Sequence, residues 1–174
     1  KDNSCNKKEN DQFTIEEPQI AALLLQIQKQ KDSIKIDTGK QHYYQPKTLS
    51  DALELINKLQ SAILVNGATD VALRVTKRHE LLEEIIDLSA VEELKNYTLS
   101  ETEIKLGSGM SLEAIKTIIQ TELPALYDTL TVFGSKQIRS VATLGGNLGS
   151  ASPIGDTLPI LMAYNAEVVW KSIN

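Results

Sequence analysis

Cysteine is almost absent from this sequence, since Cys5 is the only one among 174 residues. A single cysteine can form neither an internal disulfide nor a zinc site, so the hydrophobic core must stabilise the fold. Hydrophobic residues make up 41% of the chain, which is ordinary for a globular domain of this size. A lone thiol also suits a reducing compartment, and we expect a cytoplasmic protein.

Long apolar runs and an excess of positive charge are also lacking. The longest apolar run, Ile20 to Leu25, is far shorter than the about 20 residues that span a bilayer, and no hydrophobic stretch follows the N-terminal lysines as in a signal peptide. The formal net charge of -5 provides no basic surface for nucleic acid or anionic lipid. We therefore expect neither a nucleic-acid nor a membrane partner, and we expect any bound phosphate to be held by main-chain N–H groups.

Side chains suited to catalysis are scarce. His42 and His79 are the only histidines, and their settings predict a structural role for His42 and a solvated turn at His79. The chain contains no Gly-x-Ser-x-Gly, G-x-G-x-x-G or phosphate-loop motif, and Gly107-Ser108-Gly109 is best interpreted as a turn before a helix capped by Ser111. We predict no catalytic residue and no metal ligand in this segment. If it takes part in catalysis, a bound cofactor must supply the chemistry.

Apolar periodicity predicts a domain that mixes helices and strands. Helices are expected over 18–30, 49–59, 112–119, 123–133 and 158–164, and strands over 42–44, 62–65, 85–88 and 166–170, with a hairpin over 96–106. Residues 1–42 are predicted to form a linker or arm. Residues 43–174 are predicted to form the domain, with one lobe at about 43–90 and a second at about 91–174.

Two glycine-containing segments are candidates for ligand binding. In the first, Leu64-Val65-Asn66-Gly67-Ala68-Thr69-Asp70, an apolar strand leads directly into small residues, so a turn of main-chain N–H groups could hold an anion. Asn-Gly between apolar runs is equally a signal for a type I′ hairpin. From the residues alone, both interpretations of this segment remain open.

The second segment runs from Ser140 to Asp156 and is rich in glycine, serine and asparagine. That composition disfavours a core strand or a stable helix interior, while Val141, Leu144, Leu148 and Ile154 fix the segment to a core. We expect free N–H groups at Gly145 and Gly146. The alternative is a tight turn into a helix that Ser152 or Asp156 caps.

At these two segments the chain resembles the FAD-binding domains of the molybdenum hydroxylases. Leu64 to Asp70 looks like their first FAD diphosphate loop, and Gln137 to Leu148 followed by Ala151 to Asp156 looks like their second. The likeness extends from about Tyr43 to Trp170. Val71 to Lys77 looks closest to the bacterial xanthine dehydrogenase small subunit, which carries the iron–sulfur and FAD parts. The family also includes aldehyde oxidases and carbon monoxide dehydrogenase flavoprotein subunits.

The resemblance implies an α+β fold: a two-lobed FAD-binding domain of the molybdopterin dehydrogenase type, with a small mixed α/β lobe and a larger sheet-and-helix lobe. Where relatives usually carry a second glycine or an asparagine, this chain has Ala68, for which positive φ is costly. The implied cofactor-binding residues are Leu64, Val65, Asn66, Gly67, Ala68, Thr69, Asp70 and Val71 in the first segment, Phe133 and Ile138 beside the flavin or adenine, Thr143, Gly146, Asn147 and Ser150 as polar contacts, and Asp156 at the ribose.

The resemblance also implies parts outside this chain. We expect two [2Fe–2S] modules before residue 1, the remaining C-terminal lobe after residue 174, and a molybdenum cofactor in another domain or subunit. Cys5 is then a linker residue, because a cluster requires four cysteines. The implied activity is purine hydroxylation at molybdenum, with electrons passing through the clusters and FAD to NAD. The alternatives are an aldehyde oxidase or carbon monoxide dehydrogenase-like enzyme, and a non-catalytic domain that has lost FAD.

Overall fold

The computed structural model describes residues 11–28, 32–151 and 155–173, which fall into two compact units, 1–32 and 33–174. In the first unit, residues 12–28 form the helix α1 (Gln12–Gln28). It begins earlier than the predicted start at residue 18, because the carboxylate of Asp11 accepts hydrogen bonds from the N–H and hydroxyl of Thr14 and so caps it. Pro18 therefore lies inside the helix and not in its first turn.

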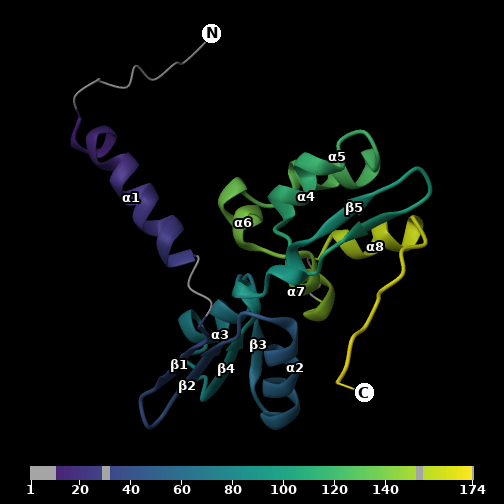
Figure 1. Ribbon diagram of the computed structural model, residues 1–174. Helices are drawn as coiled ribbons and strands as arrows, with labels where there is room; N and C mark the ends of the chain where they lie inside the picture. The colour runs from purple at the N-terminus through teal and green to yellow at the C-terminus, as the bar shows by residue number, and fades with distance from the viewer. Residues whose placement is uncertain (1–10, 29–31, 152–154, 174) are drawn as a thin grey trace. The chain divides into compact units, whose positions relative to one another are not determined.

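The second unit begins with a four-stranded mixed sheet in the order β1-β2-β4-β3 (Figure 1). Its strands are β1 (Ile34–Asp37), β2 (His42–Gln45), β3 (Ile63–Val65) and β4 (Glu84–Asp87). β1 pairs with β2 in antiparallel fashion around Gly39, whereas β4 runs parallel to both β2 and β3. The segment 33–42, assigned from the sequence to the arm, thus contributes a strand to this sheet.

Two helices connect these strands. In α2 (Leu49–Lys58), the Thr48 side chain caps the helix by accepting a hydrogen bond from the Asp51 N–H. The short α3 (Val71–Thr76) lies between β3 and β4. Because β3 and β4 are parallel, the chain must cross over between them, and the hairpin interpretation of Asn66-Gly67 is wrong.

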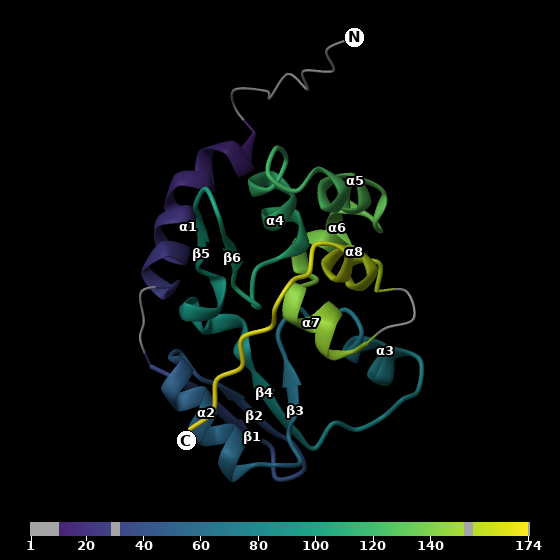
Figure 2. The same ribbon diagram turned by 90° about the vertical axis from the view of Figure 1, so that its right-hand side faces the viewer.

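The second half of the unit combines a hairpin with five helices. After two 3₁₀ turns, η1 (Leu88–Ala90) and η2 (Glu92–Lys95), the predicted hairpin is confirmed as β5 (Tyr97–Leu99) and β6 (Ile104–Leu106). The helices are α4 (Leu112–Ile118), α5 (Pro124–Val132), α6 (Lys136–Val141), α7 (Leu144–Gly149) and α8 (Thr157–Ala163). In Figure 2, α7 and α8 lie side by side, in agreement with their contacts. The predicted lobes, divided at about residue 90, stay a prediction.

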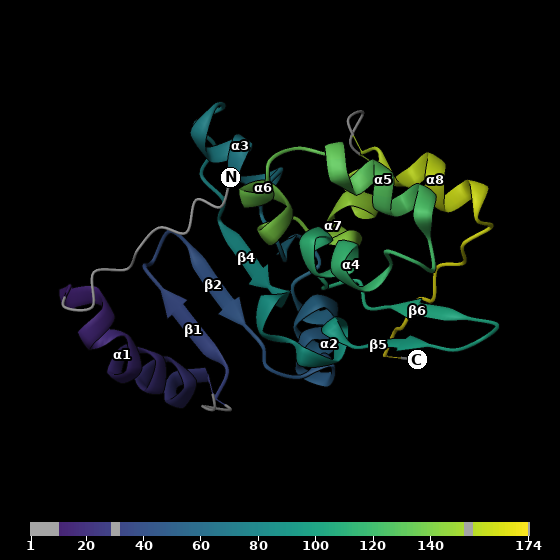
Figure 3. The same cartoon turned by 90° about the horizontal axis from the view of Figure 1, so that it is seen from above.

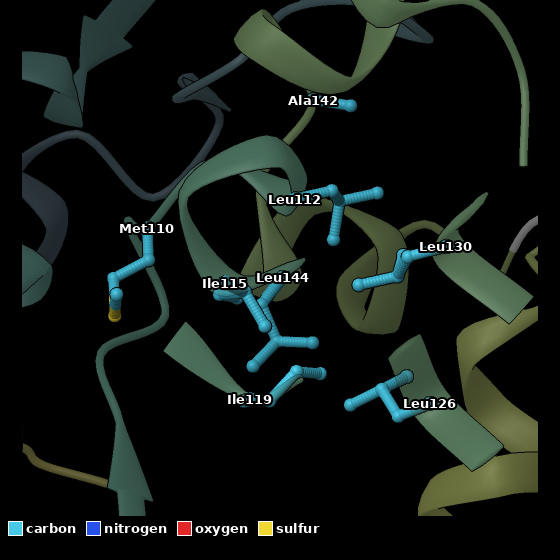
Figure 4. Packing of buried hydrophobic residues seen from close by; sticks show 8 residues of the cluster. All are labelled: Met110, Leu112, Ile115, Ile119, Leu126, Leu130, Ala142 and Leu144. Carbon is cyan, nitrogen blue, oxygen red and sulfur yellow. The ribbon is translucent and has the colours of Figure 1, made fainter. Parts of the chain in front are cut away.

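One hydrophobic cluster holds these helices together (Figure 4). Its buried members are Met110, Leu112, Ile115, Ile119, Leu126, Leu130, Ala142 and Leu144. Leu112, Ile115 and Ile119 follow helical spacing along α4, as the sequence predicts, and each is 0% exposed. Ala142 and Leu144 belong to the glycine-rich segment, so this core fixes the position of that segment.

The predicted strand at 166–170 is wrong. These residues form no strand, Val169 and Trp170 are 91% and 87% exposed, and Figure 3 shows this part of the chain as a coil. Alternating apolar residues form a strand only beside a partner strand, and no described strand pairs with this segment. Across 11–28, 32–151 and 155–173, no helix is both long and apolar enough to cross a membrane.

Candidate functional site

The first candidate loop, Asn66–Asp70, leaves the sheet at the carboxyl end of β3. Val65 pairs with Asp87 at the end of β4, so two parallel strands end together there, the position where α/β sheets commonly bind ligands. The Asp87 carboxylate is held by the hydroxyl of Tyr43, which donates at 2.6 Å, and by the Ser89 N–H at 2.8 Å. Partial burial and this bond raise the pKa of Tyr43. The base of the loop is therefore fixed.

The loop itself offers a row of unused main-chain donors. No described residue accepts a hydrogen bond from the N–H groups of Gly67, Ala68, Thr69 or Asp70. Ala68 has a φ of 58°, in the left-handed region that successive N–H groups adopt when they form an anion-binding nest. This conformation is costly for alanine, and it lies at the position where the resemblance implies a glycine or an asparagine. The loop can thus present several donors to one anionic group.

Gly67 is required for a close approach between the two candidate segments. A Cβ atom on Gly67 would lie 2.1 Å from the carbonyl oxygen of Val141 and 3.1 Å from the Cα of Ala142. Gly67 is not among the residues with positive φ, so glycine is needed here for the space that it leaves and not for a left-handed backbone. The main chain of the first loop thus lies directly against the start of the second segment.

The second segment is helical, contrary to the expectation from its composition. The Thr143 side chain caps α7 by accepting a hydrogen bond from the Gly146 N–H at 3.2 Å, while Leu144 is buried and Leu148 packs against the core. Burial of these two leucines one turn apart, together with the cap, outweighs the low helix propensity of the glycines. In the alternative interpretation, Ser152 lies outside the described residues, and the Asp156 side chain does not cap α8.

The N–H groups of Gly145 and Gly146 were expected to be free, but both donate hydrogen bonds within the protein. Gly145 donates to the Ser108 carbonyl at 2.7 Å and Gly146 to the Thr143 hydroxyl. The helix has a different consequence for the site. Positions 143, 146, 147 and 150 follow the spacing i, i+3, i+4, i+7, so all four predicted polar contacts lie on one face of α7 and its caps.

A cavity of about 390 Å³ adjoins the contact between the two segments. Two predicted contacts, Asn66 and Thr143, contribute to its wall. Sequence reasoning missed Lys95, whose ammonium also pairs with Glu92 at 2.8 Å, because nothing in its local sequence distinguishes it from a surface lysine. The lining residues are Asn66, Ser89, Lys95, Gly109, Met110, Ser111, Ala114, Ser140, Val141 and Thr143.

Three further predicted residues occupy different settings. Phe133 ends α5 and packs against the core cluster, Ile138 is 46% exposed on α6, and Asp156 is exposed directly before α8. The buried Arg139 holds the turn after Phe133, because its Nη1 donates to the carbonyls of Phe133 and Gly134 at 2.8 and 2.9 Å. Its Nε donates to Glu113 at 2.7 Å, and this hydrogen bond lowers the pKa of Glu113.

Together these features define a class of protein: an α+β domain in which the donor-rich loop of a parallel β-α-β unit lies against the residues that lead into a short helix with one polar face. Comparison with known families makes this class specific. The profile described as "FAD binding domain in molybdopterin dehydrogenase" matches residues 27–174. The chain belongs to this family, and the predicted family and fold class are confirmed.

Relatives of known function agree with this assignment. The chain is 34% identical to xanthine dehydrogenase of Drosophila pseudoobscura pseudoobscura over 82% of its own length and 11% of that enzyme. It is 30% identical to the nicotinate dehydrogenase FAD-subunit of Eubacterium barkeri over 75% of its length and 46% of that subunit. It thus spans less than half of either relative.

Solved structures share the fold. A crystal structure of Cu,Mo-CO dehydrogenase in its cyanide-inactivated form matches 66% of this chain and 41% of the solved chain, with a TM-score of 0.61 and 25% sequence identity. Quinoline 2-oxidoreductase from Pseudomonas putida 86 matches 61% of this chain with a TM-score of 0.55 and 22% identity, which concerns the fold alone.

Proposed function

We propose that this chain binds FAD by its diphosphate, between the Asn66–Asp70 loop and the polar face of α7. The observation that carries the proposal is the row of main-chain N–H groups at Gly67, Ala68, Thr69 and Asp70, which donate to no residue that the structure describes. Such donors suit a diphosphate, because that group only accepts hydrogen bonds. The net charge of the chain is negative, so main-chain N–H groups and not a field of basic side chains would hold it. Leu64, Val65 and Val71 would support the loop. Phe133 and Ile138 would pack beside the ring systems, and Asp156 would accept from a ribose hydroxyl.

We also propose that the parent protein is a xanthine dehydrogenase-like molybdenum hydroxylase. When bound, FAD would supply the exchange between one-electron and two-electron transfer. The residues of this chain would hold and orient it. The proposed partners are an iron–sulfur domain, a molybdenum-cofactor domain or subunit, and NAD as acceptor, in the cytoplasm. This proposal is supported by the relatives, which are themselves dehydrogenases. The alternative is a carbon monoxide dehydrogenase-like parent, which the fold shared with Cu,Mo-CO dehydrogenase favours.

Gly146 provides the test of the binding site. A Cβ at this position would lie 2.9 Å from the Thr143 hydroxyl, so Gly146→Val places bulk on the polar face of α7. Gly149→Ala is the matched control, because it lies on the same helix and no heavy atom is within 4 Å of a Cβ there. We expect the unmodified chain and Gly149→Ala to bind added FAD, as measured by quenching of flavin fluorescence. Gly146→Val should lose binding while far-UV circular dichroism stays unchanged.

Two results would overturn the proposal. One is a folded, unmodified chain that does not bind FAD at micromolar concentrations. The other is equal FAD affinity in Gly146→Val and Gly149→Ala, which would place the cofactor away from α7. Riboflavin, which lacks the diphosphate, serves as a ligand control and should bind far more weakly than FAD.

A further inference from the structure

Thr157, the first residue of α8, is a fully buried polar residue next to the proposed site. Its exposed fraction is 0%, and its hydroxyl donates a hydrogen bond of 2.5 Å to Oδ1 of Asn147 on α7. A hydroxyl buried without a partner would destabilise the fold, and this bond satisfies it. No described buried side-chain polar atom is left without a partner. The bond therefore joins two short helices through one pair of side chains.

The bond also decides which end of the Asn147 side chain faces outward. An amide side chain has one accepting oxygen and one nitrogen with two donors. With the oxygen held by Thr157, the nitrogen is the end available to a ligand, and no described residue accepts a hydrogen bond from it. Asn147 is only partly buried and lies on the same face of α7 as Gly146 and Ser150. That face is the one proposed to contact the diphosphate.

We propose that Thr157 is a positioning residue for the cofactor, an inference that rests on the proposed function. Its hydroxyl fixes the Asn147 amide with the donor end toward the diphosphate, a group that cannot donate in return. Thr157 also directly follows Asp156, the proposed ribose contact. The Thr157–Asn147 bond thus links the proposed donor for the diphosphate to the residue that follows the proposed acceptor for the ribose.

The first test compares three threonine variants by their FAD dissociation constants. Thr157→Val keeps the branched shape and removes the hydroxyl, so the amide can turn over, and we expect affinity to fall about tenfold. Thr157→Ser keeps the hydroxyl and should stay within about threefold of the unmodified chain. Thr129→Val is the matched control, because the Thr129 hydroxyl bonds back to the Ala125 carbonyl within α5, and its affinity should be unchanged.

The second test asks whether Thr157 acts through Asn147. In an Asn147→Ala background, Thr157→Val should weaken FAD binding no further, because the amide that it orients is gone. Asn147→Asp can still accept from Thr157 but presents a charged oxygen in place of the donors, and it should lose roughly a hundredfold or more in affinity. A purely structural Thr157 would instead lower the melting temperature and weaken binding equally with or without the Asn147 amide.

The outcomes separate this inference from the one on which it rests. If the unmodified chain binds FAD and Thr157→Val binds it equally well, or if the two substitutions act independently, the positioning role is wrong and the proposed function stands. If the unmodified chain does not bind FAD, both are overturned. If Thr157→Val does not fold, Thr157→Ser and the two Asn147 variants still decide, because a Thr157→Ser affinity as low as that of Asn147→Ala would contradict a role for the hydroxyl.

Discussion

Ala68 offers a direct test of the strain in the candidate loop. Its φ of 58° lies in the left-handed region, where the Cβ atom of an L-residue costs roughly 1–2 kcal/mol. Replacing Ala68 by glycine removes this cost, and the alanine methyl is exposed, so little buried surface is lost. Glycine also gains freedom in the unfolded chain, which offsets about 0.4–1 kcal/mol of the benefit. The expected net result is a stabilisation of about 1 kcal/mol.

For a chain of this size, about 1 kcal/mol corresponds to a rise of roughly 2–4 °C in the midpoint of thermal unfolding. The assay is thermal denaturation followed by far-UV circular dichroism, with urea denaturation as a second measure of the free energy of unfolding. Ala72→Gly is the matched control, because Ala72 is an exposed alanine in right-handed helix α3. There the same substitution should destabilise by about 1 kcal/mol.

The two substitutions are chemically identical and are expected to have opposite signs, so the comparison cancels effects of composition. If Ala68→Gly lowers the midpoint of thermal unfolding as much as Ala72→Gly does, the loop does not hold residue 68 in the left-handed region. The nest of N–H groups proposed for the diphosphate would then lose its geometric basis.

Two further predictions concern contacts around the site. Gly67→Ala places a methyl 2.1 Å from the carbonyl oxygen of Val141, so the two candidate segments must separate. Urea denaturation should show that the free energy of unfolding falls by about 1–3 kcal/mol. An unchanged free energy of unfolding would exclude the close approach. The Arg139 hydrogen bond lowers the pKa of Glu113 below 4.5, so its contribution to stability is present above about pH 4.5 and is lost as the pH falls through the folded-state pKa. Glu113→Gln should therefore flatten the acid side of the stability profile, and an unchanged slope would contradict this.

The elements that the sequence predicted well are those whose signals are local. The Ser111 cap accepts the N–H of Ala114, three residues later, as N-cap side chains do, and the predicted hairpin forms two short paired strands. These patterns need no knowledge of the rest of the chain.

The elements that were missed depend on contacts remote in sequence. The glycine-rich α7 forms because Leu144 and Leu148 enter a core built mainly by α4 and α5, which no propensity scale includes. Conversely, the apolar residues at 166–170 lack a partner strand in the described chain and stay extended and exposed.

For the candidate site, the two segments were recognisable, but the physical role of each glycine was not. Gly67 matters for the space it leaves at Val141, while the left-handed residue is its neighbour Ala68. The helical spacing of 143, 146, 147 and 150 was present in the sequence and could have revealed a shared face.

The contact of Gly67 with Val141 also has a consequence for the order of events during synthesis. The two residues are far apart in the sequence, so their approach closes a long loop and belongs to the slow, non-local part of folding. A ribosome that has released only the sheet has made half of the proposed binding site. The proposed flavin capture must therefore wait until α7 has emerged and packed, and a shortage of flavin would act only on chains translated beyond this helix.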